Sequence, residues 1–273
     1  MTNNTPATDY TLAEICITAA AEAWRNDGEV FANGFGPVPR IAAALAKLTI
    51  NPDLLLTDGE AFLVSEPVPV GPRKGCQPKV CGWMPYSKVF DLVYRGKRHA
   101  MTGPSQIDRF GQTNISFIGK ADKPKAALLG VRGFPGNTVS HANSMWAPSH
   151  DKRTFVEGEV DMVAGAGYNP ARFKDGRRGD TVDLRIIVSN LAVMDFGGTD
   201  KAIRVLSLHP GITFEQVQEN TGFALEGKDT CVETPAPTEE QLRLIREVID
   251  PHNMRAMTFK DDPPGDARKR ANG

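Results

Sequence analysis

Residues 125–137 read KAALLGVRGFPGN, and the predicted fold of this chain is worked out from this stretch. Residues 126–129 are apolar and long enough for one buried strand. An apolar run that ends in a glycine-rich turn is typical of the carboxyl end of a strand in an open α/β sheet, where ligands bind. Arg132 lies inside the turn, and two interpretations stay open: a ligand-binding cation, or a solvated arginine in a tight turn.

The composition is that of a soluble globular protein. Of the 273 residues, 40% are hydrophobic and 24% are charged, which is ordinary for such a protein. The net charge of −1 gives no basis for a nucleic-acid or membrane surface, and no segment approaches the ~20 apolar residues of a membrane helix. The first ten residues lack the basic start and apolar core of a secretory signal, so we expect a cytoplasmic protein.

The cysteines and histidines do not predict a metal site. Cys76 and Cys81 form one close pair, but no second pair completes a four-ligand zinc site. We therefore expect reduced structural thiols and no metal. His141 and His150 lie in a polar segment, where we interpret a lone histidine as a surface residue rather than a base.

A second glycine turn lies near the N-terminus. Residues 30–32 predict a short strand that runs into Gly34 and Gly36, ahead of a helix over residues 41–48. Such a turn brings backbone N–H groups close to a ligand. The third glycine of the dinucleotide fingerprint is missing, because Pro39 occupies its position.

A third apolar segment, residues 161–164, predicts a strand that ends at Gly165 and Gly167. Strands alternate with helices early in the chain and dominate later. This order predicts an α/β fold, an open and mostly parallel sheet flanked by helices, with antiparallel additions late in the chain. We expect a flexible leader over residues 1–10, a single domain over residues 11–258 and a disordered tail over residues 259–273.

A buried strand predicted over residues 53–57 ends in Asp58, Gly59 and Glu60. Two carboxylates at a strand end are either a candidate acid/base pair or two exposed turn residues. Residues 65–85 show no hydrophobic period and predict a loop, whose length indicates a functional segment.

Four segments resemble one known family. They are SQIDRFGQTNISFIG (105–119), KPKAALLGVRGFPGN (123–137), VDMVAGAGY (160–168) and LSLHPGITFEQVQENTGFAL (206–225). The chain resembles the β subunits of class I coenzyme A transferases, of the glutaconate CoA-transferase type, over about residues 10–255. The resemblance implies the three-layer α/β/α fold of that family, an α chain of similar fold in an α2β2 heterotetramer, an acyl-CoA substrate, and no cofactor beyond the coenzyme A of the substrate.

The chain departs from the family at the catalytic glutamate. In the transferases this glutamate lies six residues after the aspartate of a Pro-Asp pair, and here the pair is Pro52 and Asp53. The corresponding position is Gly59, which has no side chain and cannot act as a nucleophile. Glu60 and Asp58 flank it, but one step along an extended chain points to the opposite face, unless a bulge turns one of them inward.

A second departure lies in the oxyanion turn, where the family has G-x-G-G and this chain has Arg132 as the third residue. Both departures together resemble the β subunits of the steroid ring-opening acyl-CoA hydrolases of actinobacteria. That resemblance implies retro-Claisen cleavage of a 6-oxocyclohexene-carboxyl-CoA, with the essential carboxylate supplied by the α chain. An active CoA transferase that uses Glu60, and a non-catalytic partner subunit, remain as alternatives.

The resemblance also implies roles for particular residues. Arg132 and the Gly133 backbone N–H would hold a substrate carboxylate or stabilise an oxyanion. The residues expected to line the substrate crevice are Gly34, Gly36, Asn137, Gly165, Gly167 and Tyr168.

Overall fold

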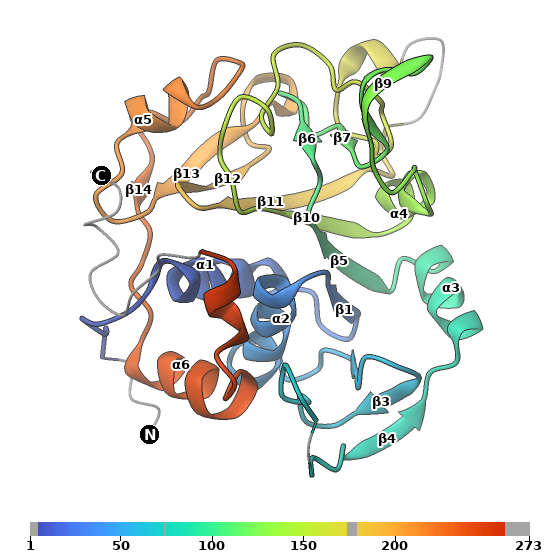
Figure 1. Cartoon of the computed structure of the whole chain (residues 1–273), viewed down its shortest axis with the longest axis vertical. Helices are drawn as coiled ribbons and strands as arrows, with labels where there is room; N and C mark the ends of the chain where they lie inside the picture. The colour runs from blue at the N-terminus through green and yellow to red at the C-terminus, as the bar shows by residue number, and fades with distance from the viewer. Residues whose placement is uncertain (1–4, 74, 174–178, 260–273) are drawn as a thin grey trace. The chain divides into compact units, whose positions relative to one another are not determined.

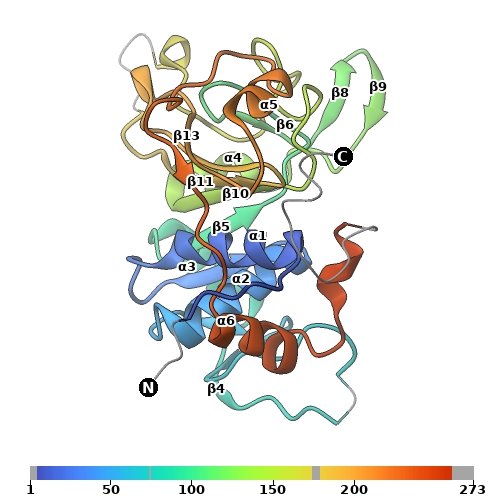
Figure 2. The same cartoon turned by 90° about the vertical axis from the view of Figure 1, so that its left-hand side faces the viewer.

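The computed structural model describes residues 5–73, 75–173 and 179–259. The chain forms two compact units, both drawn in Figures 1 and 2. The first unit runs to Thr102 and resumes at Thr234, and the second comprises Gly103–Glu233. The domain boundaries predicted at residues 10 and 258 stay a prediction, and all but the first residue of the predicted tail lies outside the described residues.

The first unit combines helices, one parallel strand pair and a small antiparallel sheet. Its helices are α1 (Leu12–Ala21), α2 (Pro37–Thr49), α3 (Tyr86–Tyr94) and α6 (Glu239–Arg243), with helical turns at Glu22–Trp24, Leu244–Ile249 and Met254–Met257. The parallel strands are β1 (Phe31–Gly34) and β5 (Arg98–Thr102), and the antiparallel sheet is β2 (Leu56–Thr57), β3 (Phe62–Val64) and β4 (Val80–Trp83). Helix α2 packs against both α1 and β1.

Capping boxes fix where two of these helices begin. The Thr11 hydroxyl accepts the Glu14 N–H, and the Glu14 carboxylate accepts the Thr11 N–H. Thr238 and Gln241 repeat this exchange at the start of α6. Just before α1, the Ala7 N–H donates to the Pro237 carbonyl at 2.8 Å, so the described part of the predicted leader contacts the segment ahead of α6.

The second unit is built on a mixed sheet in the order β10–β11–β12–β13–β14. Its strands are β10 (Ala142–Ala147), β11 (Asp183–Ser189), β12 (Ala192–Asp195), β13 (Arg204–Leu208) and β14 (Val232–Glu233); β10–β11 and β13–β14 are parallel, and β11–β12 and β12–β13 antiparallel. Two ribbons pair β6 (Gln106–Ile107) with β7 (Thr113–Asn114) and β8 (Phe117–Lys120) with β9 (Lys123–Ala127). The helices are α4 (Phe134–Ser140) and α5 (Phe214–Glu219), with turns at Pro170–Arg172 and Thr199–Lys201.

These pairings confirm the predicted fold class. Parallel pairs occur in both units, and α4 contacts β10 and β11. Within the mixed sheet of the second unit the antiparallel pairs come late in the chain, whereas the small sheet and the two ribbons add antiparallel pairs earlier. The core of the second unit is apolar, and its fully buried side chains include Ile107, Phe155, Ile187, Met194 and Ile203.

The prediction of a buried strand at residues 126–129 was wrong. The apolar run 126–129 was expected to form a buried strand, but β9 ends at Ala127, and all five of its residues are exposed. Leu128 and Leu129 are 37% and 66% exposed. β9 pairs only with β8 in a two-stranded ribbon, and such a ribbon is too small to bury either of its faces. Local hydrophobicity therefore indicated the strand but not its exposure.

The histidine interpretation was also wrong. His141 and His150 are 4% and 5% exposed. The His150 ring contacts the Ser189 hydroxyl at 2.8 Å and the Thr221 hydroxyl at 2.9 Å, and it stacks on Phe155 with centroids 3.9 Å apart. Burial lowers the pKa of His150 to about 3, so the ring is neutral. It serves as a buried hydrogen-bonding group in the core of the second unit.

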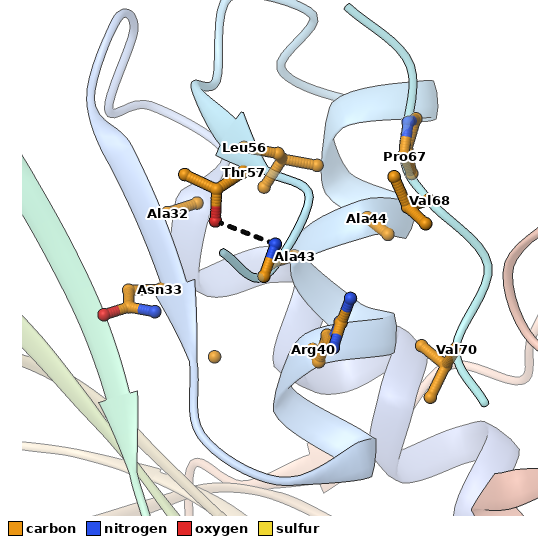
Figure 3. A pocket seen from close by; sticks show the side chains of 12 residues that line it. Ala32, Asn33, Arg40, Ala43, Ala44, Leu56, Thr57, Pro67, Val68 and Val70 are labelled. Atoms are coloured by element: carbon orange, nitrogen blue, oxygen red, sulfur yellow. Dashed lines mark hydrogen bonds between the residues drawn. The ribbon is translucent and has the colours of Figure 1, made fainter. Parts of the chain in front are cut away.

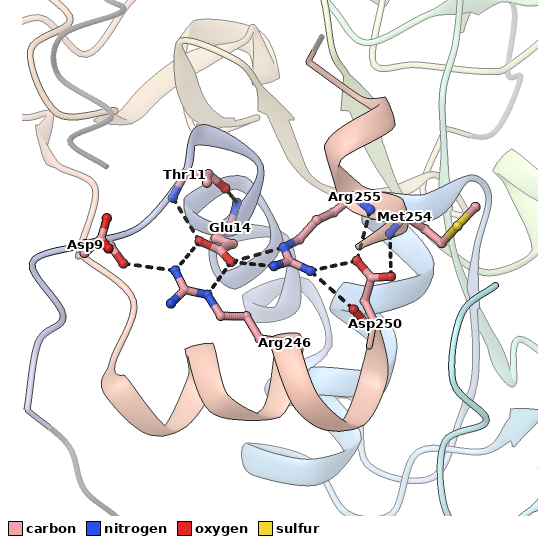
Figure 4. Close-up of polar contacts among 7 residues, drawn as sticks. All are labelled: Asp9, Thr11, Glu14, Arg246, Asp250, Met254 and Arg255. Atoms are coloured by element: carbon pink, nitrogen blue, oxygen red, sulfur yellow. Dashed lines mark hydrogen bonds and ion pairs between the residues drawn. The ribbon is translucent and has the colours of Figure 1, made fainter. Parts of the chain in front are cut away.

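A buried ion-pair network ties the ends of the first unit together (Figure 4). The Glu14 carboxylate is fully buried and accepts hydrogen bonds from Arg246 at 2.8 Å and Arg255 at 3.1 Å. Arg255 also pairs with Asp250 at 2.9 Å. Burial by itself raises the pKa of Glu14, but the hydrogen bonds from Arg246 and Thr11 and the charge of Arg255 outweigh it and lower the pKa.

We expect Glu14→Gln to destabilise the protein by about 3 to 5 kcal/mol, because it leaves two partly buried arginines without their shared anion. Since folding lowers the pKa of Glu14, its stabilisation is fully present above pH 4.5, the ordinary value, and is lost as the pH falls. Urea unfolding at pH 7 and at lower pH measures both effects. Glu240→Gln, which removes an exposed pair with Arg243, is the control and should change little; equal losses in the two variants would contradict the account.

Candidate functional site

The glycine turn of the second unit carries a strained arginine. Gly130 has φ +75° and Arg132 has φ +53°, a left-handed conformation that an arginine rarely adopts. The Arg132 side chain is exposed and makes no hydrogen bond or ion pair within the described part of the chain. Backbone strain of this kind costs about 1 to 3 kcal/mol and is concentrated at functional sites. The turn therefore presents an unpaired guanidinium on a strained backbone.

Next to Arg132, the space around the N-terminal end of α4 is open. Gly133 is the N-cap of α4, and its N–H donates to no residue among those described, whereas its carbonyl accepts the Asn137 N–H at 3.0 Å. A Cβ atom added at Gly130 or Gly133 would meet nothing within 4 Å. Buried Phe134 anchors the helix in the second unit. The Arg132 guanidinium and the Gly133 N–H are thus two free donors in adjacent residues.

Gly165 and Gly167 have packing roles. Residues 161–164 do not form the predicted strand, and Gly165 makes a single bridge to Thr113. A Cβ atom at Gly165 would lie 2.2 Å from the Thr113 hydroxyl, and one at Gly167 would lie 2.4 Å from the Gln112 nitrogen. These glycines let the segment approach the β6–β7 ribbon, and they lie close to α4, because Gly165 also abuts Phe134.

Tyr168 is partly buried against the same core. Its hydroxyl accepts the Leu184 N–H at 2.9 Å and donates to the Val182 carbonyl at 3.3 Å. Burial raises the pKa of Tyr168. The Lys201 ammonium lies 4.3 Å from the centre of the ring. These contacts give Tyr168 a structural role, and its expected place in a substrate crevice stays a prediction, as does that of Asn137.

The first unit holds Gly34 and Gly36 at the start of α2. A Cβ atom at Gly34 would lie 2.3 Å from the Pro39 backbone, so only glycine allows the turn to close on the helix. Gly36 is the N-cap of α2 with φ +98°. Gly34, but not Gly36, lines a small pocket of about 120 Å³ between β1, α2 and the segment that contains Val68 and Val70 (Figure 3).

Gly59, the position that the family resemblance assigns to the nucleophile, lies in the lining of this pocket. Gly59 has φ +89°, and a Cβ atom there would lie 3.1 Å from Arg73 Nη2 and 3.3 Å from Arg40 Nη2. Two guanidinium groups therefore lie beside the point where a glutamate side chain would begin. Neither arginine stands in a sequence motif, and the length of the segment 65–85, predicted as a loop, was the one signal that included Arg73. That segment contains β4 as well as irregular chain.

The carboxylates on either side of Gly59 do not form an acid/base pair. Asp58 is 4% exposed, which corrects its interpretation as an exposed turn residue. Its Oδ1 accepts the N–H groups of Glu60 at 2.9 Å and Phe62 at 3.2 Å, and its carbonyl accepts a hydrogen bond from Arg73. The Glu60 side chain is 73% exposed and pairs with Arg73 at 3.5 Å. Asp58 thus serves as a turn-forming carboxylate.

The described residues include no group of three or more His, Cys, Asp or Glu side chains that could hold a metal ion. None of the helices in the described ranges is long and apolar enough to cross a lipid bilayer.

Comparison with known proteins identifies the family of this chain. No protein-family model matches it. It is 45% identical over 255 residues to the cholesterol ring-cleaving hydrolase IpdB subunit of Rhodococcus jostii RHA1, covering 91% of this chain and 96% of that one. The crystal structure of Rhodococcus jostii RHA1 IpdAB matches with a TM-score of 0.83 at 43% identity, over 91% of this chain and 98% of that one. The B subunit of the glutaconate CoA-transferase of Acidaminococcus fermentans is 30% identical over 256 residues, 89% of this chain and 94% of that one.

These matches confirm the predicted fold as that of a CoA-transferase subunit. The chain belongs to the family of CoA-transferase B subunits, in the branch that contains the IpdB subunits of cholesterol ring-cleaving hydrolases.

We expect Gly165→Ala to destabilise the protein by about 1 to 3 kcal/mol, because its new methyl group would overlap the Thr113 hydroxyl. Gly133→Ala should change stability by less than about 0.5 kcal/mol, because its φ of −85° suits alanine and the space is open. Urea unfolding of the two variants is the measurement, and a normal midpoint for Gly165→Ala would show that the close approach is not needed.

Proposed function

We propose that this chain is the β subunit of a cytoplasmic, heteromeric acyl-CoA hydrolase that opens the ring of a 6-oxocyclohexene-carboxyl-CoA in steroid catabolism. The observation that carries the proposal is the glycine at position 59, in a chain 45% identical to a ring-cleaving hydrolase subunit. Without a carboxylate there, this chain cannot form the acyl intermediate of a transferase. A hydrolase whose catalytic carboxylate comes from the α subunit fits both the glycine at position 59 and the similarity to a hydrolase subunit.

The reaction is a retro-Claisen cleavage. A carboxylate of the α subunit takes a proton from water, and the resulting hydroxide adds to the ring ketone to give a tetrahedral alkoxide. The alkoxide collapses to a carboxylic acid, the adjacent C–C bond breaks, and its electrons form a thioester enolate that is then protonated on carbon. Negative charge therefore develops first on the former ketone oxygen and then on the thioester oxygen.

The two free donors at the turn suit this charge. The Arg132 guanidinium is unpaired within the described residues, and the adjacent Gly133 N–H is open. Two parallel N–H bonds from a planar guanidinium match a carboxylate or an enolate oxygen. We assign Arg132 and Gly133 to the developing oxyanion or to a substrate carboxylate.

An exposed aromatic face supports a partner subunit. Tyr86, Phe90 and Tyr94 recur every four residues along α3 and are 79%, 47% and 79% exposed, and Trp83 at the end of β4 is 70% exposed. Exposed aromatic residues gathered on one face mark protein interfaces. We assign this face to the contact with the α subunit, in an α2β2 assembly.

The alternative of an active CoA transferase would need Glu60 to act as the nucleophile. Glu60 is exposed and paired with Arg73, and it flanks the family position without occupying it. A non-catalytic β subunit is the other alternative, and it predicts that changes at the glycine turn affect assembly alone.

The reaction itself can be tested with the α/β complex in water enriched in ¹⁸O. The hydrolase should convert the cyclic acyl-CoA to an open-chain acyl-CoA that carries one ¹⁸O in its new carboxylate, without an acceptor acid. Appearance of a new acyl-CoA only when an acceptor acid is added, with the ring intact, would instead identify a transferase.

We expect Arg132→Ala to lower turnover about 100- to 1,000-fold in the assembled complex, because one charged donor to the oxyanion is lost. Arg132→Lys should not restore turnover, since lysine cannot form two parallel hydrogen bonds. Arg153→Ala, which removes an exposed arginine paired with Asp151, is the control and should leave turnover unchanged. Near-normal turnover in the lysine variant would exclude the bidentate role.

A further inference from the structure

The pocket beside Gly59 has one charged side chain in a wall that is otherwise uncharged. Figure 3 shows Ala32 and Asn33 from β1, Arg40 from α2, and Val68 and Val70 from the facing segment around it. Of the described residues that line the pocket, Arg40 alone is charged; the others include Gly34, Ala43, Ala44, Leu56, Thr57, Gly59 and Pro67. A volume of about 120 Å³ exceeds the ~10–15 Å³ that one water requires and suits a short chain with a carboxylate.

Arg40 reaches this pocket without a partner. Its side chain makes no hydrogen bond or ion pair with any residue in the described ranges, and it is only partly exposed. Burial lowers the pKa of Arg40, the nearby positive charge of Arg73 lowers it further, and only Asp58 opposes them. A partly buried cation without a hydrogen-bond acceptor is costly, and an anion in the pocket would remove that cost.

Arg73 brings a second guanidinium to the same point. Arg73 Nη2 and Arg40 Nη2 lie 3.1 Å and 3.3 Å from the place where a Gly59 Cβ would stand. Arg73 is tied to the Asp58 carbonyl and to Glu60, so its position is fixed by the turn. The two cations converge on the space that is left empty by the absent side chain.

We propose that this pocket binds a carboxylate, which Arg40 holds in the space left by the missing glutamate side chain. The apolar wall from Ala43, Leu56 and Val68 suits the methylene groups of an acyl chain better than a hydrated phosphate. This inference rests on the proposed function in one respect: the ligand is taken to be a second carboxylate on the acyl group of the substrate, remote from the thioester. A free carboxylic acid would use the same chemistry.

The test measures binding and turnover in the purified α/β complex. Calorimetry with succinate should show binding that Arg40→Gln weakens about 10- to 100-fold, the effect of one charged hydrogen-bonded pair. Arg40→Lys should bind with intermediate affinity, because it keeps the charge and loses the fork. Arg25→Gln, which removes an exposed pair with Glu22, is the matched control and should bind as the wild type does.

Turnover then distinguishes the two sources of the carboxylate. If the substrate supplies it, Arg40→Gln raises KM about 10- to 100-fold for an acyl-CoA with a remote carboxylate and leaves KM unchanged for the analogue without it. If a free acid supplies the carboxylate, Arg40→Gln affects the KM of both acyl-CoAs alike, and succinate binding still depends on Arg40. The proposal is overturned if the wild type and Arg40→Gln bind succinate equally. It is also overturned if the binding of free coenzyme A depends on Arg40. Arg40-dependent succinate binding without any ring opening would instead refute the proposed function and leave the carboxylate site standing.

Discussion

The backbone at Gly59 is the constraint on which the chemistry of this chain depends. The residue has a left-handed φ of +89°, and two guanidinium groups lie within 3.3 Å of the point where a side chain would begin. A glutamate here would be strained in its backbone, and the ends of both arginine side chains would have to shift by a few tenths of an ångström. Position 59 of this chain carries no carboxylate, and the side chains nearest to it belong to two cations, Arg40 and Arg73. Under the proposed function, the reactive carboxylate comes from the partner subunit.

Two residues of the segment 206–225, which carries part of the family resemblance, belong to the buried polar network of the second unit. In LSLHPG…VQENTGF, His209 contacts the Ser189 carbonyl at 2.9 Å, and the Thr221 hydroxyl contacts the buried ring of His150. Burial lowers the pKa of His209 to about 4, so both histidines are neutral. Such a network holds the sheet of the second unit in place and would be needed whatever the reaction. Differences in chemistry within the family are thus to be sought at Gly59 and Arg132.

The sequence predicted those features that local patterns determine. The alternation of strands and helices indicated the α/β class, because it depends on neighbouring residues. The capping-box pairs at the starts of α1 and α6 are local in the same way, since their residues lie three apart in the sequence. Burial could not be predicted where tertiary packing decides it: 126–129 became an exposed ribbon and His150 a core residue. Arg132 was found because it interrupts a glycine turn, whereas Arg40 looks like any helical arginine until its lack of a partner is seen.

Whether this chain forms a covalent intermediate is the direct test of the account. The α/β complex can be incubated with a cyclic β-keto acyl-CoA, quenched with borohydride, and the intact mass of this chain measured. We predict an unmodified mass together with an open-chain acyl-CoA product, because position 59 offers no nucleophile. An adduct on this chain, mapped to Glu60, would show that the transferase mechanism survives and would contradict the central claim.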